Sequence, residues 1–383
     1  MSAPRLNPRA LVSVVSDGYV VYDVDHNQFH ELNPAAAFLL ELCNGQHQVD
    51  EIVAIAAEIF PADARAAVLG WIRDAEQTGL LQQDGAAAAA PLTRDELVER
   101  AASLRDDGYV HAAFVCQEHA VGLVPDDGTL LRELGELAHI LGRRDAARSA
   151  FERCLEQDPD DAEIRHLLTS LRDEAPPQRV PDECIRQLYH RFASFYENNM
   201  CGELGYEGPA HLTAVMDQAL GQRTDLRVLD LGCGTGLAGA AVRPRAQRLV
   251  GVDLSPEMIE RATARDIYDE LHTAEVTAWL NGTSEQFDLI VACDTFIYFG
   301  DLSPVLRPAA RRLSDEGVIA FSVERADSGT HQLTDNGRYV HHRSHVDTAA
   351  QSAGLRVRCD REAFLRMEYG SPVDGLFVCL SRS

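Results

Sequence analysis

The sequence predicts a multidomain α/β protein in which a small α+β domain, an α-helical repeat segment and a larger parallel-sheet domain follow one another. Short β-rich runs open the chain, and a 34-residue self-similarity comes next. From Pro176 onward, apolar strands alternate with helical stretches, as in a mostly parallel sheet covered on both faces. The length of 383 residues agrees with more than one domain.

Residues 1–83 are predicted to form the first domain. Asp17-Gly18 lies between two β-branched and aromatic runs, which predicts a two-strand hairpin. Asn33-Pro34 then opens a helical stretch that Gly45 can end, and the stretches VDEIVAIAAEIF and DARAAVLGWIRDAEQTG follow. Three short strands and three helices indicate a winged-helix-like unit.

A family resemblance gives this first domain an expected role. The stretches GYVVYDVDHNQFHELNPAAAFLLELCNG, VDEIVAIAAEIF and IRDAEQTGLL resemble the PqqD family, known as the RiPP recognition element. The resemblance implies that the leader of a ribosomally made precursor peptide adds as a strand to the sheet edge, against the last helix. The strand at 27–32, with Asn27 and Phe29, and the helix at 63–79 would then line the peptide groove. The alternative is a plain winged helix used for packing or dimerisation.

Residues 84–92, which include the low-complexity run DGAAAAAP, are expected to be a linker. In residues 93–175, Gly108, Ala113, Ala120 and Pro125 recur 34 residues later as Gly142, Ala147, Cys154 and Pro159, a period typical of tetratricopeptide (TPR) repeats. The helix AEIRHLLTSLRDE is expected to cap the stack. This segment could act as a spacer, a docking surface or the contact of a homodimer, with the spacer as the first interpretation.

Residues 176–383 contain the glycine loop VLDLGCGTG after an apolar strand. The loop lacks the third glycine of a dinucleotide fingerprint and the Gly-Lys-Ser/Thr of a P-loop. Asp230 suits a cationic amino group, and Asp253, at the end of the next strand, is placed to accept two ribose hydroxyls. A ligand with an ammonium group, a ribose and no phosphates is required. S-adenosylmethionine (SAM) fits this description.

The segment from Leu204 onward resembles class I SAM-dependent methyltransferases, and more narrowly the predicted methyltransferases that carry TPR repeats. VLDLGCGTGLAGAAVRPRAQRLVGVDLSPEMIERA, FDLIVACDTFIYFGDL and GRYVHHRSHV are among the stretches that carry the resemblance. It implies a Rossmann-like domain. Carried over by position, the cofactor-binding residues would be Asp230, Gly232, Cys233, Gly234, Gly236, Asp253, Leu254, Met258, Ala274, Glu275 and Asp294.

The resemblance also suggests residues for catalysis and for the methyl acceptor. His341 matches a family motif and is the candidate base, with Tyr298 and Glu324 as further catalytic candidates. Arg338 could position a charged group of the acceptor. The helix-forming stretch 188–199 would cover the cofactor as a lid, with Tyr189 and Tyr196 facing the substrate. No histidine or cysteine spacing indicates a metal site.

The amino-acid composition disfavours some classes of binding partner. With 60 Asp and Glu against 35 Lys and Arg, the net charge is −25, which disfavours nucleic acid and anionic membranes as partners. No signal peptide or long apolar span is evident, and nine scattered cysteines favour reduced thiols, so a cytoplasmic location is expected. The first functional hypothesis is a methyltransferase acting on a precursor peptide captured by residues 1–83. Two alternatives are methylation of a small metabolite and a SAM-binding scaffold without turnover.

Overall fold

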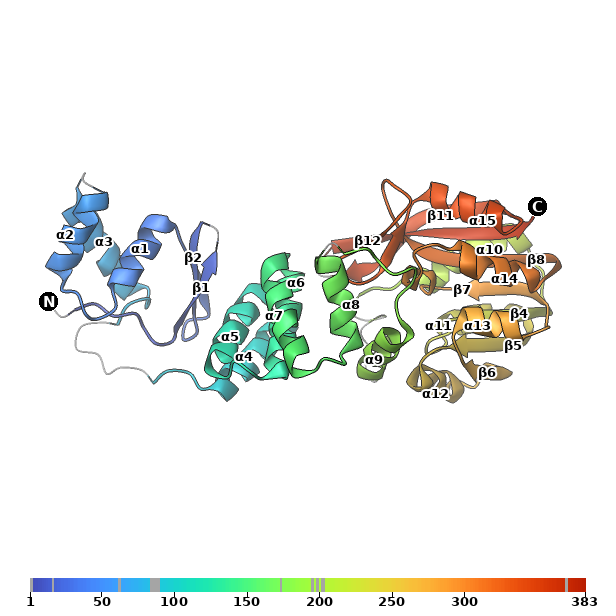
Figure 1. Ribbon diagram of the computed structural model, residues 1–383, viewed down its shortest axis with the longest axis horizontal. Helices are drawn as coiled ribbons and strands as arrows, with labels where there is room; N and C mark the ends of the chain where they lie inside the picture. Colours follow the sequence, from blue (N-terminus) through green and yellow to red (C-terminus); the bar gives the residue numbers. More distant parts are fainter. Residues whose placement is uncertain are drawn as a thin grey trace. The chain divides into compact units, whose positions relative to one another are not determined.

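The computed structural model describes residues 3–15, 17–60, 63–82, 90–172, 174–193, 196–197, 200, 204–368 and 371–383. The chain divides into two compact units, Met1–Asp158 and Pro159–Ser383 (Figure 1). Most of the linker expected at 84–92 lies outside the described residues. No helix in the described ranges is long and apolar enough to cross a membrane.

The first unit begins with a three-stranded antiparallel sheet in the order β1-β2-β3, followed by three helices. These elements are β1 (Ala10–Val15), β2 (Gly18–Asp23), β3 (Gln28–Leu32), α1 (Pro34–Leu42), α2 (Val49–Ile59) and α3 (Ala64–Gln77). The predicted hairpin is confirmed, because Val15 pairs with Gly18 around Asp17. The predicted helix start is also confirmed, since the Asn33 side chain accepts a hydrogen bond from the backbone N–H of Ala36 at 2.9 Å.

The rest of the first unit is helical. It consists of α4 (Arg94–Asp106), α5 (Val110–Leu123), α6 (Gly128–Ile140) and α7 (Arg144–Gln157). Small residues allow α6 and α7 to pack closely: Ala147 is fully buried, and a Cβ atom on Gly135 would overlap the ring of Phe151. These contacts agree with the packing that the repeat pattern predicts.

Among its described residues, the second unit contains a nine-stranded sheet with the main order β11-β12-β8-β7-β4-β5-β6, and β10 joins β9 to β8 (Figure 1). The strands are β4 (Leu226–Leu231), β5 (Ala246–Asp253), β6 (Glu270–Thr273), β7 (Phe287–Ala292), β8 (Leu313–Arg325), β9 (His331–Leu333), β10 (Tyr339–His341), β11 (Leu355–Glu368) and β12 (Ser371–Arg382). β4 to β8 pair in parallel, and β11 and β12 form the antiparallel pair that the sequence predicts. The carboxyl ends of β4, β5 and β7 therefore meet at one edge.

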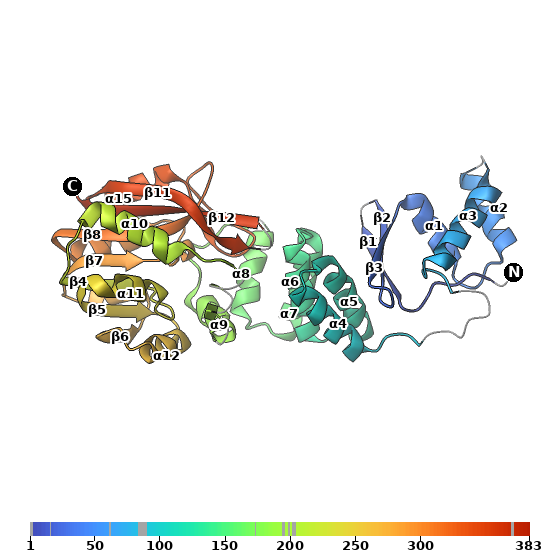
Figure 2. The ribbon, with the colours of Figure 1, turned by 180° about the vertical axis from the view of Figure 1, so that it is seen from behind.

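Helices cover both faces of this sheet, as expected for a Rossmann-like fold. The helices α10 (Gly208–Leu220) and α11 (Leu237–Val242) lie on the face seen in Figure 2. The helices α13 (Val276–Gly282), α14 (Ser303–Arg311) and α15 (Arg343–Ser352) cover the opposite face. Alternate residues of β4 explain this arrangement, since Leu229 and Leu231 belong to one apolar cluster and Val228 to the other. The predicted α/β fold class is confirmed.

Helix α8 (Ala162–Leu171), which the sequence predicts as the cap of the repeat stack, also makes contacts that the sequence does not predict. The boundary between the units falls before it, and it packs against α9 (Asp182–Phe192) in the second unit. Gln187 on α9 accepts a hydrogen bond from the backbone N–H of Ala162 at 2.9 Å, and His166 Nε2 bonds to the carbonyl of Gly337 at 2.9 Å. A sequence period cannot reveal these long-range contacts, which fix α8 beside the sheet domain.

Candidate active site

The glycine loop connects β4 to α11 and brings bare backbone to the end of the sheet. Gly232, Gly234 and Gly236 have φ angles of 66°, 54° and 95°, in the left-handed region that favours glycine. A Cβ atom on Gly232 would overlap the Thr295 side chain, whereas one on Gly234 would meet no atom within 4 Å. The loop therefore leaves open space in front of Gly234.

Asp253 ends β5 directly beside this loop. Its Oδ2 accepts a hydrogen bond from the backbone N–H of Gly234 at 2.8 Å, and its Oδ1 accepts one from the backbone N–H of Ser255 at 2.8 Å. Burial raises the pKa of the Asp253 carboxyl, while these backbone donors act in the opposite direction. Each oxygen keeps a second lone pair, so a ligand hydroxyl could still donate to it.

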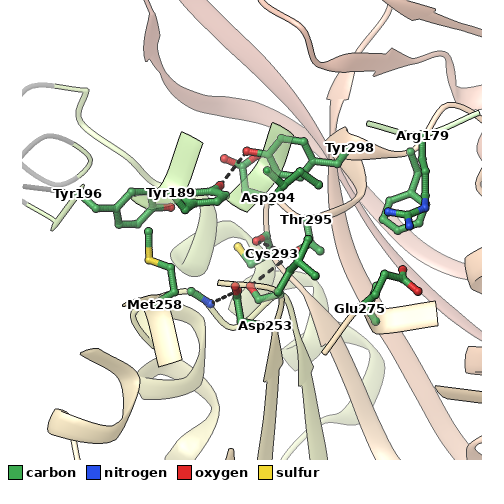
Figure 3. A pocket seen from close by; sticks show the side chains of 16 residues that line it. Arg179, Tyr189, Tyr196, Asp253, Met258, Glu275, Cys293, Asp294, Thr295 and Tyr298 are labelled. Carbon is green, nitrogen blue, oxygen red and sulfur yellow. Dashed lines mark hydrogen bonds between the residues drawn. The ribbon is translucent and has the colours of Figure 1, made fainter. Parts of the chain in front are cut away.

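An open pocket with an empty volume of about 630 Å³ lies in front of these residues (Figure 3). That volume is within the range of small-molecule sites. Its floor comes from the ends of the parallel strands and its opposite wall from α9 and Tyr196. The lining residues are Arg179, Ile185, Tyr189, Tyr196, Gly232, Gly234, Asp253, Leu254, Met258, Glu275, Val276, Cys293, Asp294, Thr295, Tyr298 and Phe299.

Tyrosine side chains form one wall of the pocket. The hydroxyls of Tyr189 and Tyr298 are 2.7 Å apart and hydrogen-bonded, and the rings of Tyr189 and Tyr196 meet edge to face with centroids 6.0 Å apart (Figure 3). Burial raises the pKa of Tyr189 to about 12 and that of Tyr298 well above its usual value. These hydroxyls are therefore neutral at physiological pH and available as hydrogen-bond donors or acceptors.

Behind this wall lies a buried ion-pair network. Arg366 Nη1 is 2.9 Å from Asp294 Oδ2, and Arg366 also pairs with Glu324 and Glu368. Arg338 pairs with the same two glutamates. The network joins β8 to β11 and holds the Asp294 carboxylate at the pocket surface.

Two buried carboxylate oxygens have no hydrogen-bond partner among the described residues: Asp230 Oδ1 and Asp294 Oδ1. The other oxygen of Asp230 accepts a hydrogen bond from the Tyr268 hydroxyl at 2.7 Å, and burial raises the pKa of Asp230 to about 7. Unsatisfied acceptors of this kind require N–H or O–H donors. SAM carries an ammonium group, ribose hydroxyls and no phosphate, so its chemistry fits the open glycine loop, Asp253 and the free oxygen of Asp230.

The structure brings most of the predicted site residues together. Those that line the pocket are Gly232, Gly234, Asp253, Leu254, Met258, Glu275, Asp294, Tyr189, Tyr196 and Tyr298. Cys233 and Ala274 are adjacent in the chain to lining residues, Asp230 and Gly236 are two residues from one, and none of the four lines the pocket itself. Asn27 and Phe29 belong to the first unit, where Asn27 Oδ1 accepts a hydrogen bond from the Tyr22 hydroxyl at 2.7 Å and Phe29 is 41% exposed.

His341 does not occupy the position expected of a base. It lies on β10, is fully buried and does not line the pocket. Its Nε2 is 2.8 Å and 3.0 Å from the backbone carbonyls of Phe299 and Gly300, so Nε2 must carry the proton. Burial lowers the pKa of His341 to about 4. We therefore correct this assignment and interpret His341 as a structural residue that holds the 299–300 backbone.

Glu324 and Arg338 also require correction. Both are held within the buried ion-pair network, and neither lines the pocket. Arg338 Nε donates to Glu324 Oε1 at 2.9 Å, so its charge is already compensated. These two residues support the pocket wall from behind.

Sequence reasoning missed Arg179, Thr295 and Arg366. Arg179 lies just after Pro176, where the sequence indicates only the start of the third segment, yet Val180 N–H donates to the Tyr298 carbonyl at 2.8 Å and thereby anchors this segment at the pocket. Thr295 follows Asp294 after β7, so the strand-end rule could have identified it. Arg366 carries no local signal, because only the pairing of β11 with β12 brings it to the site.

Three protein families match parts of the chain. The family described as "Methyltransferase domain" matches residues 229–319, which include the glycine loop, Asp253 and Asp294. The second unit contains a methyltransferase domain. The family "Coenzyme PQQ synthesis protein D (PqqD)" matches residues 18–81, and "Tetratricopeptide repeat" matches residues 129–171. The resemblances expected from the sequence are confirmed.

Individual relatives match the methyltransferase domain. The chain is 30% identical over 105 residues to the malonyl-[acyl-carrier protein] O-methyltransferase of Acetivibrio thermocellus, which is 27% of this chain and 37% of that protein. It is 35% identical over 123 residues to the magnesium-protoporphyrin O-methyltransferase of Rhodobacter capsulatus, 30% of this chain and 54% of that protein. The chain thus spans less than two thirds of either relative. A solved SAM-dependent methyltransferase from Clostridium acetobutylicum aligns with 51% of this chain and 99% of its own, at 16% identity and a TM-score of 0.40.

Proposed function

We propose that this protein is a SAM-dependent methyltransferase that modifies a ribosomally made precursor peptide captured by its PqqD domain. The observation that carries the proposal is the combination, in one chain, of a PqqD domain with a pocket built from a glycine loop and Asp253. The pocket accounts for the chemistry and the PqqD domain for the choice of substrate.

The residues that would hold SAM follow from the pocket. The free lone pairs of Asp253 suit ribose hydroxyls, and Leu254 and Met258 offer apolar contacts for the adenine ring. Gly232 and Gly234 leave room for the methionine part. Glu275 caps the N-terminus of α13, because its two oxygens accept hydrogen bonds from the backbone N–H groups of Thr277 and Ala278.

When bound, SAM supplies a methyl group on a sulfonium that a nucleophile can displace in line. The protein must therefore position the acceptor in line with the methyl group and exclude water from the pocket. Tyr189, Tyr196 and Tyr298 wall off the pocket opposite the glycine loop, and the Tyr189–Tyr298 hydrogen bond joins α9 to the segment after β7. We assign these three residues to shaping the acceptor site.

Peptide capture is assigned to β3, an edge strand of the three-stranded sheet. An edge strand offers unpaired backbone groups to any extended peptide, and neighbouring side chains supply selectivity. Phe29 gives this edge an exposed apolar side chain. The leader would lie along β3, with α3 completing the groove.

The test uses the full chain, SAM and candidate precursor peptides encoded beside the gene, each with and without its leader. Mass spectrometry would detect replacement of a hydrogen by a methyl group and locate it in the core peptide. We expect leader-dependent methylation. SAM binding by calorimetry together with no modification of any peptide would reject the peptide assignment and direct the search to small metabolites.

A further inference from the structure

The acceptor end of the pocket contains a buried carboxylate oxygen that points to a particular class of ligand. Asp294 follows β7, lines the pocket and has a side chain only 9% exposed. Its Oδ2 faces Arg366, but its Oδ1 has no hydrogen-bond partner among the described residues. A buried carboxylate oxygen left unpaired is costly, so this atom calls for a donor from a ligand.

The surroundings of Asp294 determine the charge of that donor. The ion pairs among the described residues join three carboxylates, those of Asp294, Glu324 and Glu368, to the two guanidinium groups of Arg338 and Arg366. Counted over the described residues, this network has one more negative than positive charge. Burial also raises the pKa of Asp294, against the opposing effect of Arg366, as expected for a carboxylate that lacks full compensation.

The cations near the pocket are already engaged by carboxylates. Arg366 contacts three of them, and Arg179, which lines the pocket, donates to Asp182 Oδ1 at 2.5 Å. In the part of the chain that the structure describes, an anionic acceptor at this end would face Asp294, while Arg366 and Arg179 are already paired with carboxylates. A carboxylate acceptor is therefore disfavoured on electrostatic grounds.

The aromatic residues favour the opposite charge. Tyr189, Tyr196 and Tyr298 line the same part of the pocket as Asp294, and the Asp294 charge contributes, after burial, to the raised pKa of each hydroxyl (Figure 3). Tyrosine faces attract ammonium groups, and neutral hydroxyls can accept their N–H bonds. A carboxylate and three tyrosines together form a site suited to a protonated amine.

We propose that Asp294 Oδ1 binds the amine of the methyl acceptor, so that the acceptor is an amino group and not a carboxylate. A nitrogen attacks only with a free lone pair, so the bound ammonium first gives one proton to the Asp294 carboxylate; the N–CH3 bond then forms as the S–CH3 bond of the sulfonium breaks and leaves a thioether. This inference rests on the proposed methyltransferase function and specifies its substrate class. Asp294 then acts as a specificity-determining residue, with Arg366 as the positioning residue that fixes its carboxylate. The three tyrosine rings surround the bound amine.

The test uses the full chain loaded with S-adenosylhomocysteine and two probes with the same carbon skeleton, n-butylammonium and butyrate. Ligand-observed NMR would measure the affinity of each probe. We expect wild-type protein to bind butylammonium and to discriminate against butyrate. We expect Asp294→Asn to bind butylammonium about tenfold more weakly, as for loss of a charge-assisted hydrogen bond. Asp315→Asn, at an exposed site, is the control for the change in net charge.

Several outcomes would overturn the inference. Butyrate binding as tightly as butylammonium, no butylammonium binding, or equal affinity in wild type and Asp294→Asn would each do so. The N–H donor to Asp294 could also come from the ammonium group of SAM, and calorimetry distinguishes the two sources. If Asp294→Asn weakens SAM binding as much as it weakens butylammonium binding, Asp294 binds the ammonium of the cofactor. If Asp294→Asn does not fold, the wild-type protein still tests the inference, because the inference requires it to bind butylammonium more tightly than butyrate. Failure of wild-type protein to bind S-adenosylhomocysteine would count against the proposed function, and butylammonium would then be titrated into the unloaded chain.

Discussion

At the scale of single residues, Asp253 is the side chain on which the cofactor assignment depends most directly. Both of its oxygens accept backbone N–H bonds, from Gly234 and Ser255. In Asp253→Asn the amide NH2 must face one of these two donors, whichever way the side chain turns. We therefore expect SAM affinity to fall by about tenfold or more, measured by calorimetry.

Asp266→Asn is the matched control for this experiment. Asp266 is exposed and has a φ of 54°, which asparagine tolerates. It should retain the wild-type affinity for SAM. Unchanged SAM binding by folded Asp253→Asn would contradict the assignment of Asp253 to the ribose.

Asp230 provides a prediction about pH. Burial raises its pKa from 3.8 to about 7, so the folded chain holds a proton there that the unfolded chain releases near pH 4. The contribution of Asp230 to the stability of the unliganded protein must then fall as the pH rises from about 4 to about 7, and stay level above that. The Asp230→Asn variant should not show this loss, and its free energy of unfolding at pH 8 should exceed that of wild type by up to about 4 kcal/mol. It should gain little near pH 4.

Chemical unfolding of the unliganded chain at several pH values would measure this difference. In a Trp71→Phe background, the fluorescence of Trp279 reports on the second unit alone, since Trp279 packs against its core. A stability difference between Asp230→Asn and its parent that does not change with pH would exclude the buried titration.

The residue scale also shows what sequence can predict of a site. Gly232, Gly234 and Asp253 lie at the ends of strands or within a few residues of them. Their spacing in the sequence was therefore enough to predict that they line one pocket. His341 and Arg338 lie on or beside short strands whose direction depends on pairing with β8 and β9. Whether such side chains face the pocket or the core is a matter of register, which the residue pattern does not contain.

At the scale of elements, β3 is predicted to be the binding edge for the leader. Phe29→Asp places a charge on this exposed strand and should weaken the binding of a labelled leader peptide by about tenfold or more, because apolar contact is replaced by an unpaired charge. Fluorescence polarisation would measure the affinity of the full chain for the labelled leader. SAM affinity should not change, since Phe29 belongs to the other unit.

Val14→Asp is the control for this edge. Val14 is 72% exposed and lies on β1, at the opposite edge of the same three-stranded sheet. It introduces the same charge away from the proposed groove. Equal loss of leader binding in the two variants would argue against β3 as the docking strand.

Elements with strong local signals were predicted well from the sequence. The hairpin predicted at Asp17-Gly18 forms with Val15 paired to Gly18, the first residue of β2, and the Asn33 cap fixes the start of α1. Helix α8 was predicted as a helix, but its contacts with the second unit were not predicted. Its place depends on Gln187 and Gly337, which are distant in sequence, so amphipathic spacing alone cannot determine it.

At the scale of the whole molecule, the acidic character agrees with the proposed chemistry. SAM carries a sulfonium and the inferred acceptor an ammonium, while the chain has a net charge of −25. Such a field speeds the encounter with cationic ligands and slows it for anionic ones, most strongly at low salt. The pocket and the overall charge thus favour the same class of ligand.

Separate capture and chemistry lead to a prediction for the complete protein. If the PqqD domain holds the leader, the core peptide meets the pocket at a raised effective concentration, and kcat/KM should exceed that of the leaderless core by roughly 100- to 10,000-fold. Free leader added in trans should compete with the full precursor and inhibit its methylation. It should leave methylation of concentrated leaderless core unchanged, because that peptide does not use the PqqD domain.

In the Phe29→Asp variant, the ratio of kcat/KM for the full precursor to kcat/KM for the leaderless core should be smaller than in wild type. Activation of leaderless core by free leader would instead show that the leader acts on the catalytic unit itself, and simple tethering would have to be abandoned.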